Sequence, residues 1–462
     1  MDTRSLAISA GILALAAPAV LPAPAGLPEP AWLASGLAFA MALWWVTEAL
    51  PLAATALLPL AAAPVLGIAE LADVAGAFSD PLIILFLGGF LLAKAIEKSG
   101  LHRRLAFSLI GIAGTRPDRV LAAVMVTTAF LSLWISNTAS AMVIAPVAAA
   151  IAASQDDRPE FATALMLGVA FAATIGGMGS LIGTPPNAIF AAHVRSAYGV
   201  EVGFAQWALV GVPVAVTLLA LAWLVLARVT PRLRPAALAA PLRACRQPMT
   251  APERRVAVIA GLTALAWILR PVLEWVFPSV MLTDAGIAML AAMAVFVVPD
   301  GQGGRVLDWH GAAGLRWDVL ILFGGGLALA GILDRTGLAA WIGAQVGLLE
   351  HLPALLLLLI IAALIVYVGE LASNTAMAAI FLPIAGAVAV SLGTDPLAFM
   401  LPVALAASVG FMLPVATPPN AIVFANPAVT RSAMLRAGAP LDLVGILVAV
   451  GVSSVLGPLV LG

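Results

Sequence analysis

Long apolar stretches follow one another along almost the whole chain, and only short polar segments separate them. A helix that crosses a membrane needs about 20 predominantly apolar residues. By this criterion we predict eleven transmembrane spans, at residues 5–24, 31–48, 51–67, 81–98, 161–194, 206–228, 254–277, 281–299, 317–334, 398–430 and 437–461. The pattern therefore predicts an all-α polytopic membrane protein.

Two further apolar stretches, 119–154 and 352–392, do not fit as single spans. Residues 120–153 alone would form a helix of about 51 Å, whereas the hydrocarbon core of a bilayer is only about 30 Å thick. Each stretch has Ser-Asn-Thr near its centre, and these residues favour caps and turns over helix interiors. We predict two re-entrant hairpins with these tripeptides at their tips. The alternative is a long tilted helix whose polar residues face a neighbour.

The second half of the chain repeats motifs of the first half at a nearly constant offset. The motif Ser-Asn-Thr-Ala begins at Ser136 and again 237 residues later at Ser373. The motif Thr-Pro-Pro-Asn begins at Thr184 and again 233 residues later at Thr417. Because five predicted crossings separate the two copies, the second copy is inverted in the membrane. Such inverted-topology repeats are typical of secondary transporters, and a channel is the alternative.

The composition excludes a soluble globular protein. Hydrophobic residues make up 63% of the 462 residues and charged residues only 10%, against roughly 25% charged residues in a typical soluble domain. The net charge of -1 gives no general attraction to nucleic acid. The expected surroundings of this chain are therefore a lipid bilayer.

The basic residues predict the orientation of the chain. With the N-terminus in the cytoplasm and both hairpins returning to the side they enter, only Arg195, Arg270 and Arg335 of the 22 lysines and arginines fall outside. An excess of basic residues on the cytoplasmic side is the usual bias of membrane proteins. We predict a multi-pass protein of the cell's inner (plasma) membrane with a cytoplasmic N-terminus. The first stretch has a second interpretation, a cleavable signal peptide that ends near residue 25.

Each hairpin is followed by a span that cannot be one regular helix. Residues 176–187 contain four glycines and two adjacent prolines, and Gly410, Pro414 and a second proline pair interrupt the tenth span. Irregular backbone at membrane depth is tolerated only where it is buried in protein or lines a wet cavity. There, its carbonyl oxygens suit a sodium ion and the N-termini of its half-helices suit an anion.

The tips and breaks offer hydroxyls, amides and backbone dipoles, but no lysine, arginine or histidine. Such a site can hold an anion through Ser, Thr and Asn donors, helix N-termini and co-bound cations. We expect two symmetric sodium sites, one for each pair of tip and break. Glu370, near the second tip, is either a functional group or a structural carboxylate bonded to a helix N-terminus. The alternative of an intramembrane enzyme finds no nucleophile–base pair in the sequence, so we do not expect an enzyme.

These motifs resemble those of the divalent anion/sodium symporter family, which carries di- and tricarboxylates or sulfate. The resemblance covers essentially the whole chain and rests on segments 44–51 and 132–138, on the second Ser-Asn-Thr tripeptide and on both Thr-Pro-Pro-Asn loops. It implies a homodimer in which a transport part moves as an elevator against a scaffold part. The corresponding division is 1–118 for the N-terminal scaffold helices, 119–229 for the first hairpin and broken helix, 230–351 for a cytoplasmic loop and the second scaffold set, and 352–462 for the second hairpin and broken helix.

The resemblance also implies roles for individual residues. One sodium site takes Ser132, Ser136, Asn137 and Gly183, and the other takes Gly369, Ser373, Asn374 and Ala416. The substrate would contact the tips and breaks through Ser136, Asn137, Thr138, Thr184, Ser373, Asn374, Thr375, Thr417 and Pro418. Sodium-coupled members often have threonine where this chain has Gly369.

The function that the resemblance implies is import of a C4 dicarboxylate, such as succinate, fumarate or malate, with sodium as the coupling ion. Two alternatives stay open: sodium-independent exchange of di- or tricarboxylates, and sodium/sulfate symport. We favour sodium symport because no basic side chain at the tips or breaks could replace a sodium ion.

Overall fold

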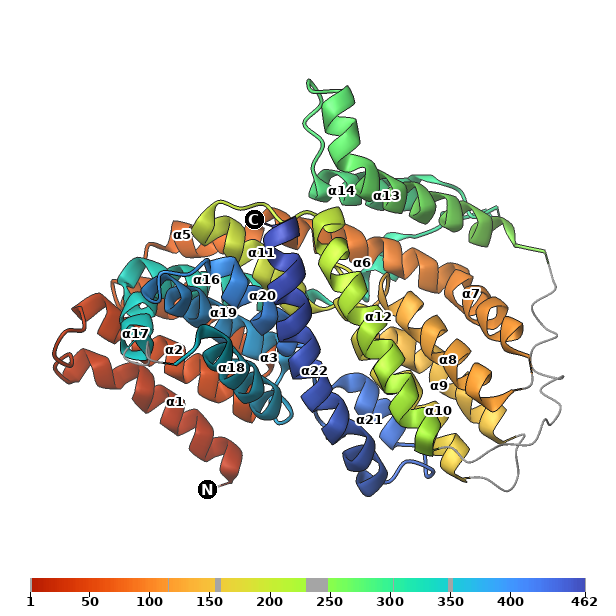
Figure 1. The fold of residues 1–462 in the computed structure, drawn as a ribbon. Helices are drawn as coiled ribbons and strands as arrows, with labels where there is room; N and C mark the ends of the chain where they lie inside the picture. Colours follow the sequence, from red (N-terminus) through yellow and green to blue (C-terminus); the bar gives the residue numbers. More distant parts are fainter. Residues whose placement is uncertain are drawn as a thin grey trace.

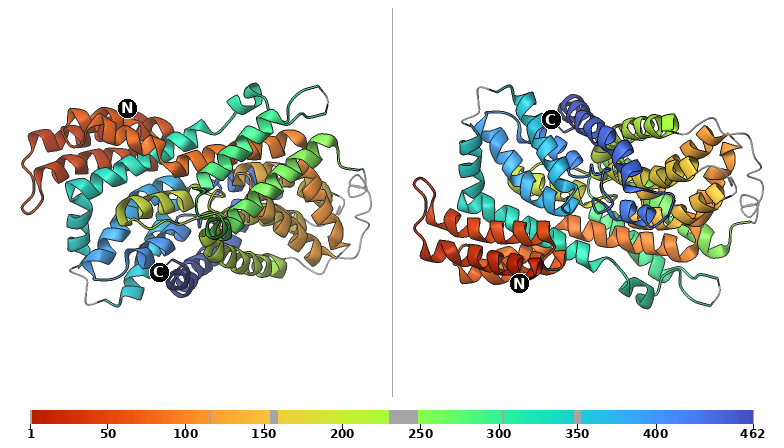
Figure 2. Two further views of the ribbon diagram at one scale, coloured as in Figure 1. Left: turned by 90° about the horizontal axis from the view of Figure 1, so that it is seen from above. Right: turned by 90° about the horizontal axis from the view of Figure 1, so that it is seen from below.

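The computed structural model describes residues 2–114, 116–153, 159–229, 248–301, 303–347 and 352–461. Within these ranges the chain folds into helices that pack side by side (Figure 1). The helices before the first repeat are α1 (Thr3–Val20), α2 (Glu29–Thr47), α3 (Leu52–Ala56), α4 (Leu58–Val65) and α5 (Leu71–Gly76). Helices α1 and α2 form an antiparallel pair at one end of the molecule (Figure 2).

The repeat is confirmed by the positions of the helices. The first copy consists of α6 (Pro81–Ser99), α7 (Leu101–Ile110), α8 (Pro117–Ser132), α9 (Asn137–Ala153), α10 (Pro159–Met178), α11 (Pro185–Tyr198) and α12 (Phe204–Val229). The second copy consists of α16 (Trp317–Thr336), α17 (Leu338–Gly347), α18 (Ala354–Gly369), α19 (Asn374–Ser391), α20 (Pro396–Ala406), α21 (Pro418–Phe424) and α22 (Arg431–Val460). Helices α7 and α8 begin and end 237 residues before α17 and α18, the same offset as the motifs.

Matching glycines end the first helix of each copy. Gly100 follows α6 with φ 79°, and Gly337 follows α16 with φ 80°. A left-handed residue at this position allows the last turn to close, and only glycine adopts it without steric cost. The ends of α6 and α16 therefore have the same local structure, in keeping with the repeated sequence.

Among the described residues between the copies, three helices occur: α13 (Ala251–Val276), α14 (Asp284–Val297) and α15 (Trp309–Ala313). Helix α14 packs closely along α6. A Cβ atom at Gly88 of α6 would lie 2.6 Å from the carbonyl carbon of Ala288, so the two backbones touch there. This contact joins the segment between the copies to the first helix of the repeat.

Nine helices in the described part of the chain are long and apolar enough to cross a membrane. Four predicted spans are shorter or divided: 51–67 forms α3 and α4, 161–194 is divided between α10 and α11, 281–299 contains only α14, and 398–430 is divided between α20 and α21. The helical stretch from Leu52 to Val65 is interrupted at Leu57, because Pro59 has no N–H to donate to the carbonyl group of Thr55. Helix α14 is short because Thr283 caps its N-terminus, where its hydroxyl accepts a hydrogen bond from the N–H of Gly286.

The broken helices exchange partners between the two copies. The two hairpins, α8–α9 and α18–α19, lie on opposite sides of the molecule (Figure 1). Helix α11 of the first copy packs against α19 of the second, and α21 of the second copy packs against α9 of the first. Helices α12 and α22 lie side by side between the two hairpins (Figure 1). This exchange brings both tips and both breaks to the centre of the molecule.

Candidate functional site

The two tips are short turns between helices. Helix α8 ends at Ser132 and α9 begins at Asn137, while α18 ends at Gly369 and α19 begins at Asn374. Ser136 caps α9, because its carbonyl accepts from the N–H of Ser140 at 2.9 Å and its hydroxyl accepts from the N–H of Ala139 at 3.2 Å. The polar tripeptides therefore stand where the chain reverses, as the sequence predicts.

The two breaks have nearly the same geometry. Thr184 precedes α11 with φ -142° and ψ 145°, and Thr417 precedes α21 with φ -141° and ψ 150°. Both residues are extended N-caps, and each is followed by two prolines in the first turn of the helix. Proline is favoured there because its missing N–H would have no partner in the helix. The motif thus starts a new helix in the middle of an apolar stretch.

The asparagine that ends each Thr-Pro-Pro-Asn motif holds the break together. The side-chain NH₂ group of Asn187 donates to the carbonyls of Gly177 and Ser180 at 3.1 and 2.8 Å. That of Asn420 donates to the carbonyls of Gly410 and Leu413 at 3.1 and 2.9 Å. Both asparagines are fully buried. They join the two halves of each broken helix and do not face the cavity described next.

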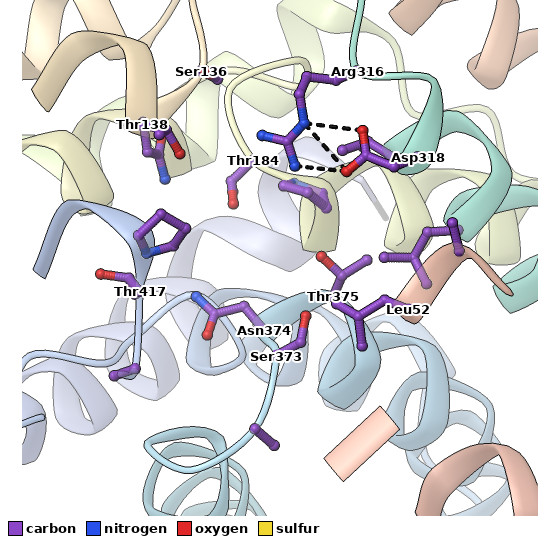
Figure 3. Close-up of a pocket in the computed structure, with 18 of the residues that line it drawn as sticks. Leu52, Ser136, Thr138, Thr184, Arg316, Asp318, Ser373, Asn374, Thr375 and Thr417 are labelled. Carbon is purple, nitrogen blue, oxygen red and sulfur yellow. Dashed lines mark hydrogen bonds and ion pairs between the residues drawn. The ribbon is translucent and has the colours of Figure 1, made fainter. Parts of the chain in front are cut away.

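A cavity of about 810 Å³ lies between the tips and the breaks (Figure 3). All nine predicted substrate-binding residues line it: Ser136, Asn137, Thr138, Thr184, Ser373, Asn374, Thr375, Thr417 and Pro418. Of the remaining residues predicted for sodium, Gly183 and Ala416 also line the cavity. Ser132 and Gly369 are buried and do not line the cavity. The structure therefore places both copies of each motif around one space, while the roles of these residues stay predictions.

Oxygen atoms converge around Asn137 at the first tip. One side-chain amide atom of Asn137 lies 2.7 Å from the hydroxyl oxygen of Ser132, 3.1 Å from the carbonyl oxygen of Ala173 and 3.3 Å from that of Gly183. This atom is the NH₂ nitrogen, which donates to all three oxygen atoms, and a cation among these oxygens would take the place of the amide hydrogens. The donor set is therefore suited to a hard cation. Ala173, which the sequence analysis missed, contributes a backbone oxygen to it.

The second tip has fewer side-chain oxygens. The side-chain oxygen of Asn374 is buried and has no hydrogen-bond partner within the described ranges. Gly369 stands at the place that Ser132 occupies in the first copy, so the second tip lacks that hydroxyl. A buried acceptor without a donor costs free energy unless a ligand satisfies it. The second tip is therefore also suited to a cation, but it offers one side-chain oxygen fewer than the first tip.

Glu370 binds the backbone of the second break. It is 1% exposed, and its two carboxylate oxygens accept from the N–H groups of Met412 and Leu413 at 2.9 and 2.7 Å. Asp442 of α22 accepts from the N–H of Phe411 at 3.0 Å. These bonds favour the structural interpretation of Glu370, although the N–H groups belong to the break and not to a helix N-terminus.

One part of the sequence interpretation needs correction. The tips and breaks indeed offer no basic side chain, but Arg316, the N-cap of α16, lines the same cavity. Asp318 and Glu48 also line it, and all three side chains are exposed. The cavity therefore has charged residues at its solvent-exposed part and neutral polar residues deeper inside.

Comparison with known proteins agrees with this architecture. Residues 3–462 match the family described as the sodium:sulfate symporter transmembrane region. The chain belongs to the sodium:sulfate symporter family. It is thus a multi-pass membrane transporter, and the resemblance found in the sequence is confirmed.

Named relatives within the family come from staphylococci. The chain is 39% identical over 443 residues to the sodium-dependent dicarboxylate transporter SdcS of Staphylococcus saprophyticus. The aligned region covers 91% of this chain and 85% of that protein. It is 37% identical to SdcS of Staphylococcus aureus, with the same coverage. Both relatives match almost the whole chain, so the likeness includes both repeats.

Two solved structures share the fold at low sequence identity. The YdaH transporter of Alcanivorax borkumensis superposes with a TM-score of 0.60 at 15% identity, over 83% of this chain and 86% of that chain. MtrF of Neisseria gonorrhoeae superposes with a TM-score of 0.60 at 14% identity, over 98% of this chain and 94% of that chain. At this level of identity the likeness concerns the fold alone.

Proposed function

We propose that this protein imports a C4 dicarboxylate together with sodium ions across the plasma membrane. The observation that carries the proposal is the convergence of both tips and both breaks on one cavity. The naming of the staphylococcal relatives as sodium-dependent dicarboxylate transporters supports this substrate class. The cavity of about 810 Å³ has ample room for such an anion, since ligand sites commonly measure 300–1,000 Å³.

Sodium ions supply the positive charge that the deep part of the cavity lacks. One ion binds among the oxygens of Ser132, Asn137 and Gly183, and the other binds beside Asn374 at the second tip. The substrate carboxylates then accept hydrogen bonds from Thr138, Thr184 and their counterparts in the second copy. Because cation and anion share the asparagine side chains, binding of one promotes binding of the other.

Transport proceeds by movement of the two hairpins and broken helices, residues 119–229 and 352–462, against the rest of each subunit of a homodimer. The N-terminus lies in the cytoplasm, and the charged residues Glu48, Arg316 and Asp318 then mark the cytoplasmic opening of the cavity. The contact of Arg195 at the end of α11 with Asp80, the N-cap of α6, joins the moving part to the fixed part. This ion pair has to separate when the moving part changes position.

Uptake by proteoliposomes tests the proposal. Purified protein should accumulate labelled succinate in sodium medium and fail to do so when choline replaces sodium. Equal uptake in both media would contradict sodium coupling and favour the exchange alternative. Competition by unlabelled sulfate that is stronger than competition by unlabelled succinate would favour the sulfate alternative.

The number of ions follows from the dependence of uptake on membrane potential. Moving a dianion into a cell that is 100 mV negative costs about 4.6 kcal/mol, and two sodium ions cancel this cost. We propose at least three sodium ions per dianion, so that uptake rises as the interior of the vesicle is made more negative with potassium and valinomycin. An unchanged rate over about 100 mV, with the charge-moving step limiting, would contradict a third ion.

A further inference from the structure

The cavity contains one basic side chain that the predicted site does not use. Among the described residues that line it, Arg316 is the single basic one. It comes from α16, outside the tips and breaks, and Figure 3 shows it facing the same cavity as Thr184 and Asn374. A positive side chain in the cavity of an anion transporter calls for a physical explanation, because the tips and breaks are arranged to bind an anion without one.

Arg316 already binds a carboxylate in the structure. Its Nε lies 3.0 Å from Oδ1 of Asp318, and its Nη2 lies 2.9 Å from Oδ2. This is the bidentate geometry in which a guanidinium group binds a carboxylate, with two parallel N–H···O hydrogen bonds. The Asp318 carboxylate therefore occupies the position that a carboxylate of a bound anion would take.

Little free energy is needed to replace Asp318 with another carboxylate as the partner of Arg316. The side chains of Arg316 and Asp318 are 52% and 55% exposed, and exposed ion pairs contribute little net stability because water screens both charges. Asp318 lies in the first turn of α16, where the helix dipole stabilises its negative charge without Arg316. Replacing the Asp318 carboxylate with another one therefore costs little.

We propose that Arg316 contacts the transported dianion and takes one of its two carboxylates in exchange for Asp318. The other carboxylate is bound deeper, by the hydroxyl and amide groups of the tips and breaks. Asp318 then acts as a competitor that occupies Arg316 while the cavity is empty. This inference rests on the proposed function, since it concerns the same cavity and the same substrate class.

The chain contains a matched pair that serves as a control. Arg116 is the N-cap of α8 and Asp118 lies in its first turn, just as Arg316 and Asp318 do in α16. The Nε of Arg116 lies 3.2 Å from Oδ1 of Asp118, and its Nη2 lies 2.8 Å from Oδ2. These side chains are also exposed, at 63% and 40%, but they do not line the cavity. The two pairs share their local structure and differ in location.

Equilibrium binding of succinate to the purified full chain in detergent, at saturating sodium and measured by calorimetry, tests the inference. R316Q should raise the Kd and D318N should lower it, each about two- to fivefold, the scale of an exposed ion pair. R316K keeps the charge but loses the bidentate geometry, so its Kd should lie between those of wild type and R316Q. R116Q and D118N should leave the Kd unchanged.

The opposite direction of the two changes is the decisive result. If the pair only stabilised the N-terminus of α16, R316Q and D318N would shift the Kd in the same direction or not at all, and either result would overturn the inference. A change of the same size in R116Q and D118N would also overturn it. Failure of the proposed function gives a different result, namely no saturable binding of succinate by the wild-type protein, and would overturn both.

Discussion

The hydroxyl oxygen of Ser132 lies 2.7 Å from the side-chain amide of Asn137, on the opposite side of the first tip. The same hydroxyl lies 2.6 Å from the carbonyl oxygen of Ala173 in α10. The NH₂ group of the Asn137 amide donates to this hydroxyl and to the carbonyls of Ala173 and Gly183, so three oxygen atoms meet around one side chain. Ser132 does not line the cavity. It therefore contributes its hydroxyl oxygen to the proposed cation site from the side of the tip that faces away from the cavity.

Replacing Ser132 with alanine should weaken sodium binding. The variant loses one ligand oxygen, and a bond between a neutral and a charged group is worth about 1.5–3 kcal/mol. We expect the sodium concentration for half-maximal succinate uptake to rise about tenfold or more. Ser140→Ala is the matched control, because Ser140 is a buried serine of α9 whose hydroxyl has no partner within the described residues. A normal sodium response in Ser132→Ala would exclude Ser132 from the site.

The second tip offers the opposite experiment, a gain of a ligand. A Cβ atom at Gly369 would have Met377 Cγ as its nearest neighbour, at 3.7 Å, so a small side chain fits there. Gly369→Ser should supply the hydroxyl that Ser132 supplies in the first copy and should lower the half-maximal sodium concentration. Gly369→Ala controls for the stiffer backbone, which stabilises a helix by up to about 1 kcal/mol. Equal sodium responses of the serine and alanine variants would show that the hydroxyl does not bind the ion.

Two glycines at matching places in the repeat should respond differently to alanine. A Cβ atom at Gly177 would lie 2.3 Å from the side-chain oxygen of Asn137, whereas at Gly410 the nearest atom is Ala416 Cβ at 3.4 Å. Gly177→Ala should therefore displace Asn137 and abolish sodium-dependent uptake, while Gly410→Ala should keep most of it. Size-exclusion chromatography checks that both variants stay folded. Full activity of Gly177→Ala would mean that the position of Asn137 is not critical.

Glu370→Gln should loosen the second break without altering the first. The glutamine keeps one acceptor but places its NH₂ group against the N–H of Met412 or Leu413, at a cost of about 1.5–3 kcal/mol for the lost charged bond. We expect a lower melting temperature and a higher half-maximal sodium concentration. The exposed Glu160 provides the control, since Glu160→Gln should change neither quantity. A Glu370→Gln variant with wild-type melting and uptake would contradict the structural role.

The hairpins and breaks were predictable because their signals are local. Ser-Asn-Thr inside a long apolar stretch marks a turn wherever the rest of the chain lies, and α9 does begin at Asn137 and α19 at Asn374. A Thr-Pro-Pro segment likewise ends one helix and starts another through its own backbone. Repetition at a fixed offset then extended each inference to the second copy.

Features that depend on packing were not predictable in the same way. Arg316 follows the short helix α15, and only the position of α16 brings it to the cavity. The carbonyl oxygen of Ala173 carries no sequence signal, since every residue has one. The two broken helices also continue differently: α11 extends to Tyr198, whereas α21 ends at Phe424, shortly before Pro427. These differences arise from residues outside the shared motifs.

The exchange of broken helices between the copies has a consequence for how the protein folds during its synthesis. Helix α11 belongs to the first copy, but it packs on α19, α16 and α20 of the second. During synthesis α11 therefore leaves the ribosome long before the surface that will cover it exists. Until the second copy is made, most of the packing surface of α11 stays uncovered in the membrane, so its final assembly is one of the last steps in the folding of the chain.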